Sequence, residues 1–398
     1  MPYPTQYAGR LNANEIFASI FNMIISQQVF ADNIKDTKSS LVDAARVDGS
    51  MYGDTKLYYA TDVLRSYAWG GDAEAANLLA LDRPEDPKCQ AITLNVFRQI
   101  RLTVDNYLTK RAWSTENAFN EFNSVMLGWI RDTKKVYDST TYNVYIGTYE
   151  TAEGKQSQTV VLPTDENNQE AENRLQAQTI ATKVANILVD LEDVSRDYND
   201  YENLRSYSAD DFRYVWNAEW VNMIRKLDLP TIFHKDFIDK FAEYTLPARY
   251  FGTLGTAGAV TSDGLTMRSL IEQDVTLVNS HVFKGQTLTS GTKFHLFAGD
   301  LIPAGITLAT SGGVQVPYYT EDSSIVLKIV HKSAVPYMSG FEAGTSFFNP
   351  RSLTENHYLT FAHNTIEALH DKPFITVRAE VSESEGSTPE GSEPEGSE

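Results

Sequence analysis

Hydrophobic and polar residues alternate in two neighbouring stretches of the chain, 49–64 (GSMYGDTKLYYATDVL) and 91–104 (AITLNVFRQIRLTV). A period of two residues is typical of β-strands with one covered face and one face in water. We therefore predict an outgoing and a returning strand, joined by the Gly-, Pro- and acid-rich segment 70–88. A long two-stranded excursion is only marginally stable alone, so its covered face needs another surface to lie on.

Apolar residues at helical spacing follow in two longer stretches. From Ser114 they form one stripe, and Lys134 and Lys135 suit the C-terminal end of a helix, so we predict that the helix ends there. Residues 142–162 are strand-like. A second long helix is predicted over 166–194, opening at Thr164.

The C-terminal half has a mixed pattern. Residues 211–221 (DFRYVWNAEWV) predict a buried strand that runs into a helix, and residues 234–244 predict a further helix. Residues 250–320 carry turn signals every few positions, which indicates irregular β-structure. Strands are predicted again over 323–332 and within 355–380.

Charge narrows the classes of function. The 398-residue chain has a formal net charge of −19, whereas dedicated nucleic-acid binders are usually basic, so that class is disfavoured. Residues 380–398 hold seven acidic residues and no basic one. Such a tail cannot bury a core and is expected to be disordered, either without a specific role or as an acidic interaction tail or linker.

Two further features bear on compartment. The single cysteine, Cys89, can form no internal disulfide, and we interpret it as a small apolar filler in a reducing compartment. The apolar segment 16–25 (IFASIFNMII) follows Glu15 rather than a basic cluster, and it is too short to span a bilayer. It predicts a short amphipathic helix instead of an export signal.

Motifs of enzyme chemistry are weak or missing. Residues 252–260 (GTLGTAGAV) have the glycines of a phosphate-binding loop but no lysine after them, and there is no Gly-x-Ser-x-Gly elbow. His357, His363 and His370 share one segment, but their spacing does not set two metal ligands on one face. We therefore predict no catalytic residue, no metal and no cofactor.

One segment, 195–233, is unusually dense in aromatic, arginine and acidic residues. In it DYN (Asp197–Asn199) precedes RSY (Arg205–Tyr207), and an apolar strand then runs to an Asn-Ala pair at 217–218. Near the end of the chain, an Asn-Pro-Arg turn (Asn349–Arg351) leads into an aromatic-rich strand, with PFITVRA closing the segment.

Together with the order of the parts, these stretches resemble the major capsid protein of tailed phages, the Hong Kong 97 fold, most closely the version in short-tailed phages. The resemblance in order covers about residues 14–380. It implies an α+β fold with an N-terminal arm, an extended loop, a peripheral domain with a long spine helix, and an axial domain. The implied parts are the arm at 1–45, the extended loop at 46–110, the peripheral domain with its spine helix at 111–199, the axial domain with a β-rich insertion at 200–345, returning peripheral-domain strands at 346–379 and the disordered acidic tail at 380–398.

The resemblance also gives roles to single residues. The extended loop would lie across an adjacent subunit, which would cover its strands. Arginine and aromatic residues are favoured at interfaces and in well-packed junctions, where they would brace either neighbouring subunits or only the core of one chain. The candidates for subunit interfaces or domain junctions are Asp54, Lys56, Arg196, Arg205, Tyr207, Asp210, Asp211, Arg213, Trp216, Asn349 and Arg351. No subunit cross-link is predicted, because Lys56 has no evident partner.

The implied function is that of a shell protein without catalysis, which self-assembles as pentamers and hexamers into the icosahedral head around the double-stranded DNA of a tailed phage. The implied partners are other copies of the chain, a separate scaffolding protein, a portal, and DNA contacted non-specifically, with no membrane. The protein would be located in the virion after assembly in the host cytoplasm.

Two other hypotheses remain open from the sequence. In the first, the chain is an enzyme or a β-rich carbohydrate- or ligand-binding module of another virion protein, with residues 250–345 as the recognition domain, in which Tyr318, Tyr319 and Tyr337 would stack on sugars. The chain could also be another virion part, such as a decoration protein, which differs mainly in copy number and symmetry.

Overall fold

A computed structural model of the protein describes most of the chain from residue 40 to residue 381. The described ranges are 40–49, 55–66, 83–105, 116–164, 168–226, 244–255, 260–276, 280–283, 286–304, 307–308 and 317–381. The helices are α2 (Ser40–Ala45), α4 (Glu116–Thr148), α5 (Gln169–Glu192) and α6 (Ala218–Lys226), with short 3-10 turns η3 (Ala209–Asp211) and η4 (Ala248–Tyr250). The predicted helix at 16–25, residues 234–243 of the other predicted helix, Asp54 and the acidic tail beyond residue 381 lie outside these ranges, whereas Tyr244, the last residue predicted as helix, is in a strand.

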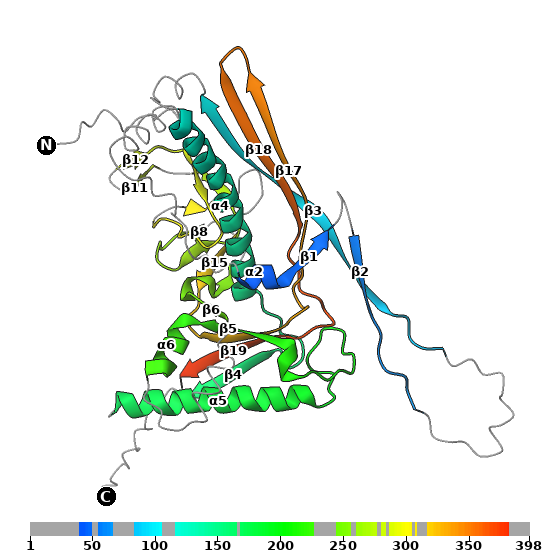
Figure 1. The fold of residues 1–398 in the computed structure, drawn as a ribbon. Coiled ribbons are helices and arrows are strands. Elements are labelled where there is room, and N and C mark those ends of the chain that lie inside the picture. Colours follow the sequence, from blue (N-terminus) through cyan, green and yellow to red (C-terminus); the bar gives the residue numbers. More distant parts are fainter. Residues whose placement is uncertain are drawn as a thin grey trace, which may run out of the picture.

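The first five-stranded sheet is long and narrow and lies beside α4 (Figure 1). Its strands, in spatial order, are β1 (Arg46–Gly49), β17 (Tyr337–Asn349), β18 (Thr354–Asn364), β3 (Lys88–Asp105) and β2 (Thr55–Ala60). Only β1 is parallel to its neighbour. The alternating segment 91–104 is confirmed as strand.

The two parts of strand β3 pair with different strands. Residues 88–93 pair with β2, and residues 94–105 pair with β18 of the same chain. Residues 94–105 are therefore held in a sheet by the chain's own hairpin, and the expectation that an adjacent subunit covers the extended loop stays a prediction. Strand β2 with residues 88–93 of β3 projects to the lower right in Figure 1, and we call this pair the projecting hairpin.

The second five-stranded sheet is covered on both faces. Its strands, in spatial order, are β4 (Ser157–Leu162), β19 (Phe374–Val381), β16 (Ile325–His331), β5 (Phe212–Asn217) and β6 (Tyr244–Leu246). Helix α5 shares a core with one face, and the C-terminal part of α4 shares a core with the other. A strand with two covered faces is apolar throughout rather than alternating. This is why β5 is buried at every position.

Helix α4 is longer than predicted. The prediction of a helix end near Lys135 followed by a strand from Tyr142 is wrong, because the helix continues to Thr148. Its β-branched and aromatic residues favour a strand locally, but Tyr142 is buried in the core shared with the second sheet. At Gly147 a Cβ atom would lie 2.0 Å from the carbonyl oxygen of Tyr250, so only glycine lets the helix pass so close to η4.

Helix α5 begins at Gln169, three residues later than the predicted start at residue 166, with Asn168 as the N-cap in place of Thr164. The Asn168 side chain accepts hydrogen bonds from the backbone N–H groups of Glu170 and Ala171, as an N-cap residue does. Its apolar stripe is buried as expected from Ile180 onward, whereas Leu175 at the start of the helix is 46% exposed.

The described residues within 250–320 form irregular β-structure, as predicted. A three-stranded sheet is built from β7 (Gly252–Leu254), β15 (Tyr318–Glu321) and β9 (Met267–Ser269). The two-stranded pairs are β10 (Gln273–Thr276) with β13 (Lys293–Leu296), β11 (His281–Phe283) with β12 (Gln286–Leu288), and β8 (Val260–Thr261) with β14 (Thr307–Leu308).

The sheets group the chain differently from the expected domain boundaries. Segment 111–199 contains β4, which is a strand of the second sheet, and α5, which packs against that sheet. Strands β5 and β16 of the same sheet come from segment 200–345. Segment 346–379 divides, with β18 in the first sheet and β19 in the second. The names peripheral and axial domain therefore stay predictions. Cys89 is exposed on the projecting hairpin, so its interpretation as a buried filler is wrong.

Candidate functional site

The projecting hairpin is fastened to the loop that follows α5 at the point where the pairing of β2 with β3 ends. Arg196 Nη1 lies 2.6 Å from Asp62 Oδ2, the backbone N–H of Leu204 donates to Asp62 Oδ1 at 2.9 Å, and Arg205 Nη2 donates to the carbonyl oxygen of Thr61 at 2.7 Å. The N–H of Leu204 and then the guanidinium of Arg196 lower the pKa of Asp62 to about 2. The carboxylate is therefore ionised, and it holds this crossing in place at neutral pH.

Asp371 anchors the same loop from the other side. Arg205 Nη2 lies 3.0 Å from Asp371 Oδ1, and Asn203 Nδ2 donates to the same oxygen at 2.9 Å. The hydroxyl of Tyr207 donates to the backbone carbonyl of Asp371 at 3.2 Å. Both side chains of the Arg205–Asp371 pair are less than one quarter exposed, so solvent screens this pair less than a surface salt bridge.

The second strand of the hairpin has its own attachments. Lys88 Nζ donates to the carbonyl oxygen of Tyr201 at 2.7 Å and lies 5.0 Å from the centroid of its ring. Gln90 donates to the carbonyl oxygen of Ala368 and accepts from the backbone N–H of His370, both at 3.0 Å. Both strands are thus held where their pairing ends, at the base of the connecting segment 61–87, and we call the set Asp62, Lys88, Arg196, Arg205 and Asp371 the base clamp.

On both sides of the base clamp, the chain presents apolar side chains to solvent: Leu57 and Tyr59 lie on β2 before Asp62, and Val63 and Leu64 directly follow it. Leu57 is 52% exposed, Tyr59 65%, Val63 52% and Leu64 77%. Strand β2 is also an edge strand, since β3 is its one neighbour in the sheet order. Exposed apolar side chains that cluster on an edge strand mark an interaction surface. The hairpin is therefore fixed at Asp62 and Lys88 and presents apolar side chains for contact on both sides of this attachment.

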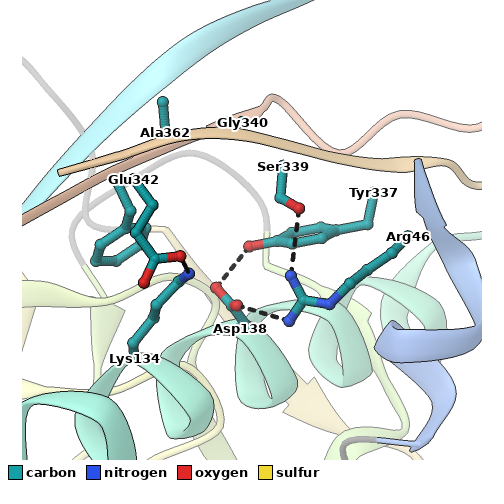
Figure 2. A pocket seen from close by; sticks show the side chains of 9 residues that line it. Arg46, Lys134, Asp138, Tyr337, Ser339, Gly340, Glu342 and Ala362 are labelled. Atoms are coloured by element: carbon teal, nitrogen blue, oxygen red, sulfur yellow. Dashed lines mark hydrogen bonds and ion pairs between the residues drawn. The ribbon is translucent and has the colours of Figure 1, made fainter. Parts of the chain in front are cut away.

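A second junction ties the N-terminal elements to α4 and β17 (Figure 2). The carboxylate of Asp138, which is 2% exposed, accepts from the hydroxyl of Tyr337 at 2.7 Å and from Arg46 Nη2 at 3.0 Å. Arg46 also donates to the hydroxyl of Ser339 at 3.3 Å. Burial raises the pKa of Tyr337 well above its usual value, so its phenol stays a donor. A cavity of about 160 Å³ opens beside these groups.

Of the predicted residues, Arg196, Arg205 and Tyr207 meet in the base clamp or directly beside it. Arg213 is almost buried and donates to the carbonyl oxygen of Ala44, which joins α2 to the second sheet. Trp216 is 2% exposed within the core shared with α5. These two residues therefore brace the interior of one chain.

The remaining predicted residues lie apart from the base clamp. Asp211 accepts from the backbone N–H of Ser208 in the turn η3, and the neighbouring Asp210 is exposed. Lys56 donates to the carbonyl oxygen of Asp48, between β2 and β1.

Asn349 and Arg351 form the turn of the β17–β18 hairpin, where the side-chain oxygen of Asn349 accepts from the backbone N–H of Arg351 at 3.0 Å. The exposed fractions of Phe347 and Phe348 beside this turn are 62% and 48%. The tip of this hairpin is thus a second exposed apolar surface, separate from the projecting hairpin.

Three members of the base clamp, Asp62, Lys88 and Asp371, are not predicted from the sequence. Each belongs to a segment that was predicted as loop or strand end, where single charged residues are common. Their partners lie more than 100 positions away, since Asp62 pairs with Arg196 and Asp371 with Arg205. No local pattern carries that information.

Burial excludes two of the three tyrosines of the sugar-stacking hypothesis, whereas Tyr318 is partly exposed. Tyr319 has no exposed surface and Tyr337 is 1% exposed, so neither ring can stack on a ligand. Within the described ranges, no group of three or more His, Cys, Asp or Glu side chains is placed to hold a metal ion. No helix in the described part of the chain is long and apolar enough to cross a membrane.

Comparison with solved structures identifies the class of fold. The chain is similar to a chain of the capsid structure of Staphylococcus phage Andhra, with 12% sequence identity, a TM-score of 0.55, and coverage of 87% of this chain and 88% of that chain. It is also similar to a chain in the structure of the head fiber and inner core protein gp22 of native bacteriophage P68, with 11% identity, a TM-score of 0.54, and coverage of 84% and 83%. The α+β fold is therefore that of phage capsid proteins, as predicted.

The family follows from the sequence. The model of the Phi29-like phage major capsid protein family matches residues 9–377. This chain belongs to the Phi29-like phage major capsid protein family. No curated protein matches the chain. The protein is thus a structural component of a phage capsid, and the predicted resemblance to phage major capsid proteins is confirmed.

Proposed function

We propose that the protein assembles as pentamers and hexamers into the icosahedral head that encloses the double-stranded DNA of a tailed phage, with no catalytic step of its own. Assembly takes place in the host cytoplasm with a separate scaffolding protein and a portal. Packaged DNA is contacted non-specifically, which agrees with the net charge of −19, because no broad basic surface is needed for a wall around DNA.

The observation that carries this proposal is the contrast within the projecting hairpin. The base clamp fastens both of its strands to the loop after α5, whereas Leu57 and Tyr59 before Asp62, and Val63 and Leu64 after it, are more than half exposed. A monomer gains nothing from such a surface, and a neighbouring subunit would bury it. In a closed shell each hairpin contacts one neighbour, and many such contacts add up to a stable particle.

A shortened hairpin tests the proposal. Residues 63–86 are replaced by a short Gly-Ser turn, which can close because Ala60 and Lys88 are register partners, and Asp62 is kept. The variant is expressed with the scaffolding protein of the same phage and examined by negative-stain electron microscopy and light scattering. The wild-type protein is expected to form shells or five- and six-membered rings, and the variant to stay soluble and unassembled with an unchanged circular dichroism spectrum.

Point variants separate the hairpin surface from a general loss of apolar surface. Replacing both Leu57 and Tyr59 by serine should reduce shell yield, whereas Val189→Ser, which alters a 68% exposed residue of α5, is the matched control. Shells formed in normal yield by the shortened hairpin would contradict the proposal. A wild-type protein that stays monomeric with its scaffolding protein would contradict assembly itself.

A further inference from the structure

A lysine lies at the centre of the second sheet. Lys328 stands in the middle of β16, in the otherwise apolar run IVLKIV, and its side chain has no exposed surface. Its Nζ donates to the carbonyl oxygen of Tyr149 at 2.9 Å and to the hydroxyl of Thr376 on β19 at 2.9 Å. Buried lysines are rare, because removing an ammonium from water is costly.

The Tyr149 bond joins this lysine to the end of α4. Tyr149 follows Thr148, the last residue of the helix, and its N–H donates to the carbonyl oxygen of Tyr145 at 2.9 Å, so it still belongs to the last helical turn. The carbonyl groups at a helix C-terminus carry partial negative charge and attract a cation. The side chain of Lys328 therefore caps the C-terminal end of α4 by its hydrogen bond to the carbonyl oxygen of Tyr149.

The charged groups around Lys328 come from three elements. Glu150 follows α4, Asp322 precedes β16 and Arg378 lies on β19, and Arg378 is ion-paired with both carboxylates. The neighbour on β5 is the apolar Val215.

The proton of Lys328 is held weakly in this setting. Burial lowers the pKa of Lys328 to about 7, the carboxylate of Glu150 opposes this change, and the guanidinium of Arg378 adds to it. The ammonium and the neutral amine are thus both accessible near neutral pH.

We propose that Lys328 is a proton-operated latch between α4 and the second sheet: the ammonium grips the carbonyl oxygen of Tyr149, and loss of its proton loosens the end of the helix. This inference goes beyond the shell function, since it concerns the chain before and after assembly alike. The neutral amine still donates to Tyr149, but without its charge the bond is weaker and the attraction to the helix end is lost.

The latch has a signature that a merely buried lysine lacks. The folded pKa lies below the ordinary value of 10.5, so the unfolded chain binds more protons between about pH 7 and pH 10.5, and overall stability rises with pH in this window. The latch, however, loosens over the same window. Local protection of the last turn of α4 should therefore fall while the stability of the whole chain rises.

Hydrogen exchange of the unassembled full-length chain tests this signature. Exchange of the amides of residues 145–151 is measured at about pH 6 and about pH 8.5 and corrected for the intrinsic rate at each pH. The protection is expected to be about fivefold lower at the higher pH, the ratio that corresponds to about 1 kcal/mol between a charged and a neutral donor. Thermal unfolding is recorded on the same samples and should shift upward.

Three variants complete the design. Lys328→Met should abolish the pH dependence of the amide protection. Lys328→Arg should keep the protection at its low-pH level, because arginine stays charged. Lys332 is an exposed lysine near the end of the same strand, and Lys332→Met should behave like the wild type. If Lys328→Met does not fold, the amide protection of the wild type, Lys328→Arg and Lys332→Met still tests the proposal. The proposal is overturned if wild-type protection does not change with pH, or if a Lys328 variant shows the same change as the wild type.

Discussion

Replacing Gly340 by alanine should detach β1 from β17. The two strands run parallel, with Gly49 opposite Gly340. A Cβ atom at position 340 would lie 1.9 Å from the carbonyl oxygen of Gly49 and 2.7 Å from its carbonyl carbon. Both are backbone atoms, which cannot rotate away as a side chain can. Since real Cβ atoms essentially never come within 3.0 Å, the strands must separate by at least 1.1 Å, the difference between 3.0 and 1.9 Å.

The expected cost follows from what that separation breaks. Overpacking of this kind costs about 1–3 kcal/mol, and each ladder hydrogen bond that is lost costs about 1 kcal/mol. The pairing covers only four residues of β1, Arg46 to Gly49, so a displacement at its end affects a large part of it. Arg46 would also lose its hydrogen bond to Ser339. We therefore expect Gly340→Ala to lower the free energy of unfolding by about 2–4 kcal/mol.

Strand β17 offers a matched control. A Cβ atom at Gly344, on the same strand, meets nothing within 4 Å. Gly344→Ala should leave stability unchanged or raise it by up to about 1 kcal/mol, because alanine restricts the unfolded chain. Urea unfolding of the unassembled protein gives the midpoints of both variants. Hydrogen exchange of residues 46–49 reports whether β1 has left the sheet.

Equal midpoints for the two variants would refute the reasoning. So would a destabilised Gly340→Ala variant in which residues 46–49 keep their wild-type protection, since the strain would then have been absorbed elsewhere. A confirmed result would establish that the N-terminal segment of the chain is fastened to the first sheet at this close contact.

Three further predictions concern the clamp, the core and acid stability. Arg205→Met removes the ion pair with Asp371 and should cost about 1–3 kcal/mol in urea unfolding, with shell yield reduced under conditions in which the fold persists. Trp216→Ala empties a fully buried site and should cost about 3–5 kcal/mol in the same assay, or leave the chain insoluble. The hydrogen bond from Arg378 lowers the pKa of Glu150 below 4.5. The ionised Glu150 therefore stabilises the folded chain, and this contribution is lost as the pH falls through the folded pKa. In thermal unfolding measured against pH, the melting temperature of Arg378→Met should decrease less on acidification than that of the wild type.

Local patterns determined much of the secondary structure. Alternation over 91–104 predicts β3, the run of apolar residues after Asp211 predicts the buried strand β5 and the helix that follows it, and the turn signals over 250–320 predict the irregular β-structure. These predictions succeed because each depends on how residues two to four positions apart share one face. The resemblance to phage capsid proteins likewise depends on the order of such elements along the chain.

The candidate site was predicted only in part. The density of Arg and Tyr residues after α5 pointed to Arg196, Arg205 and Tyr207, which do lie in the base clamp or beside it. Their partners Asp62 and Asp371 were not predicted, because only the folded chain brings such distant segments together. Whether these residues also touch a neighbouring subunit stays a prediction.

Tertiary packing decided what local pattern could not. Residues 142–148 have the composition of a strand and yet continue α4, because the core shared with the second sheet buries Tyr142 in a helical arrangement. Strands β18 and β19 are neighbours in sequence and belong to different sheets. Lys328 is a charged residue in the printed sequence, and only the covering of both faces of the second sheet makes it a buried one. The sequence by itself thus determined which segments form strands and helices, since that depends on near neighbours, whereas burial, strand partners and ion pairs depend on contacts between distant segments and were decided by the tertiary structure.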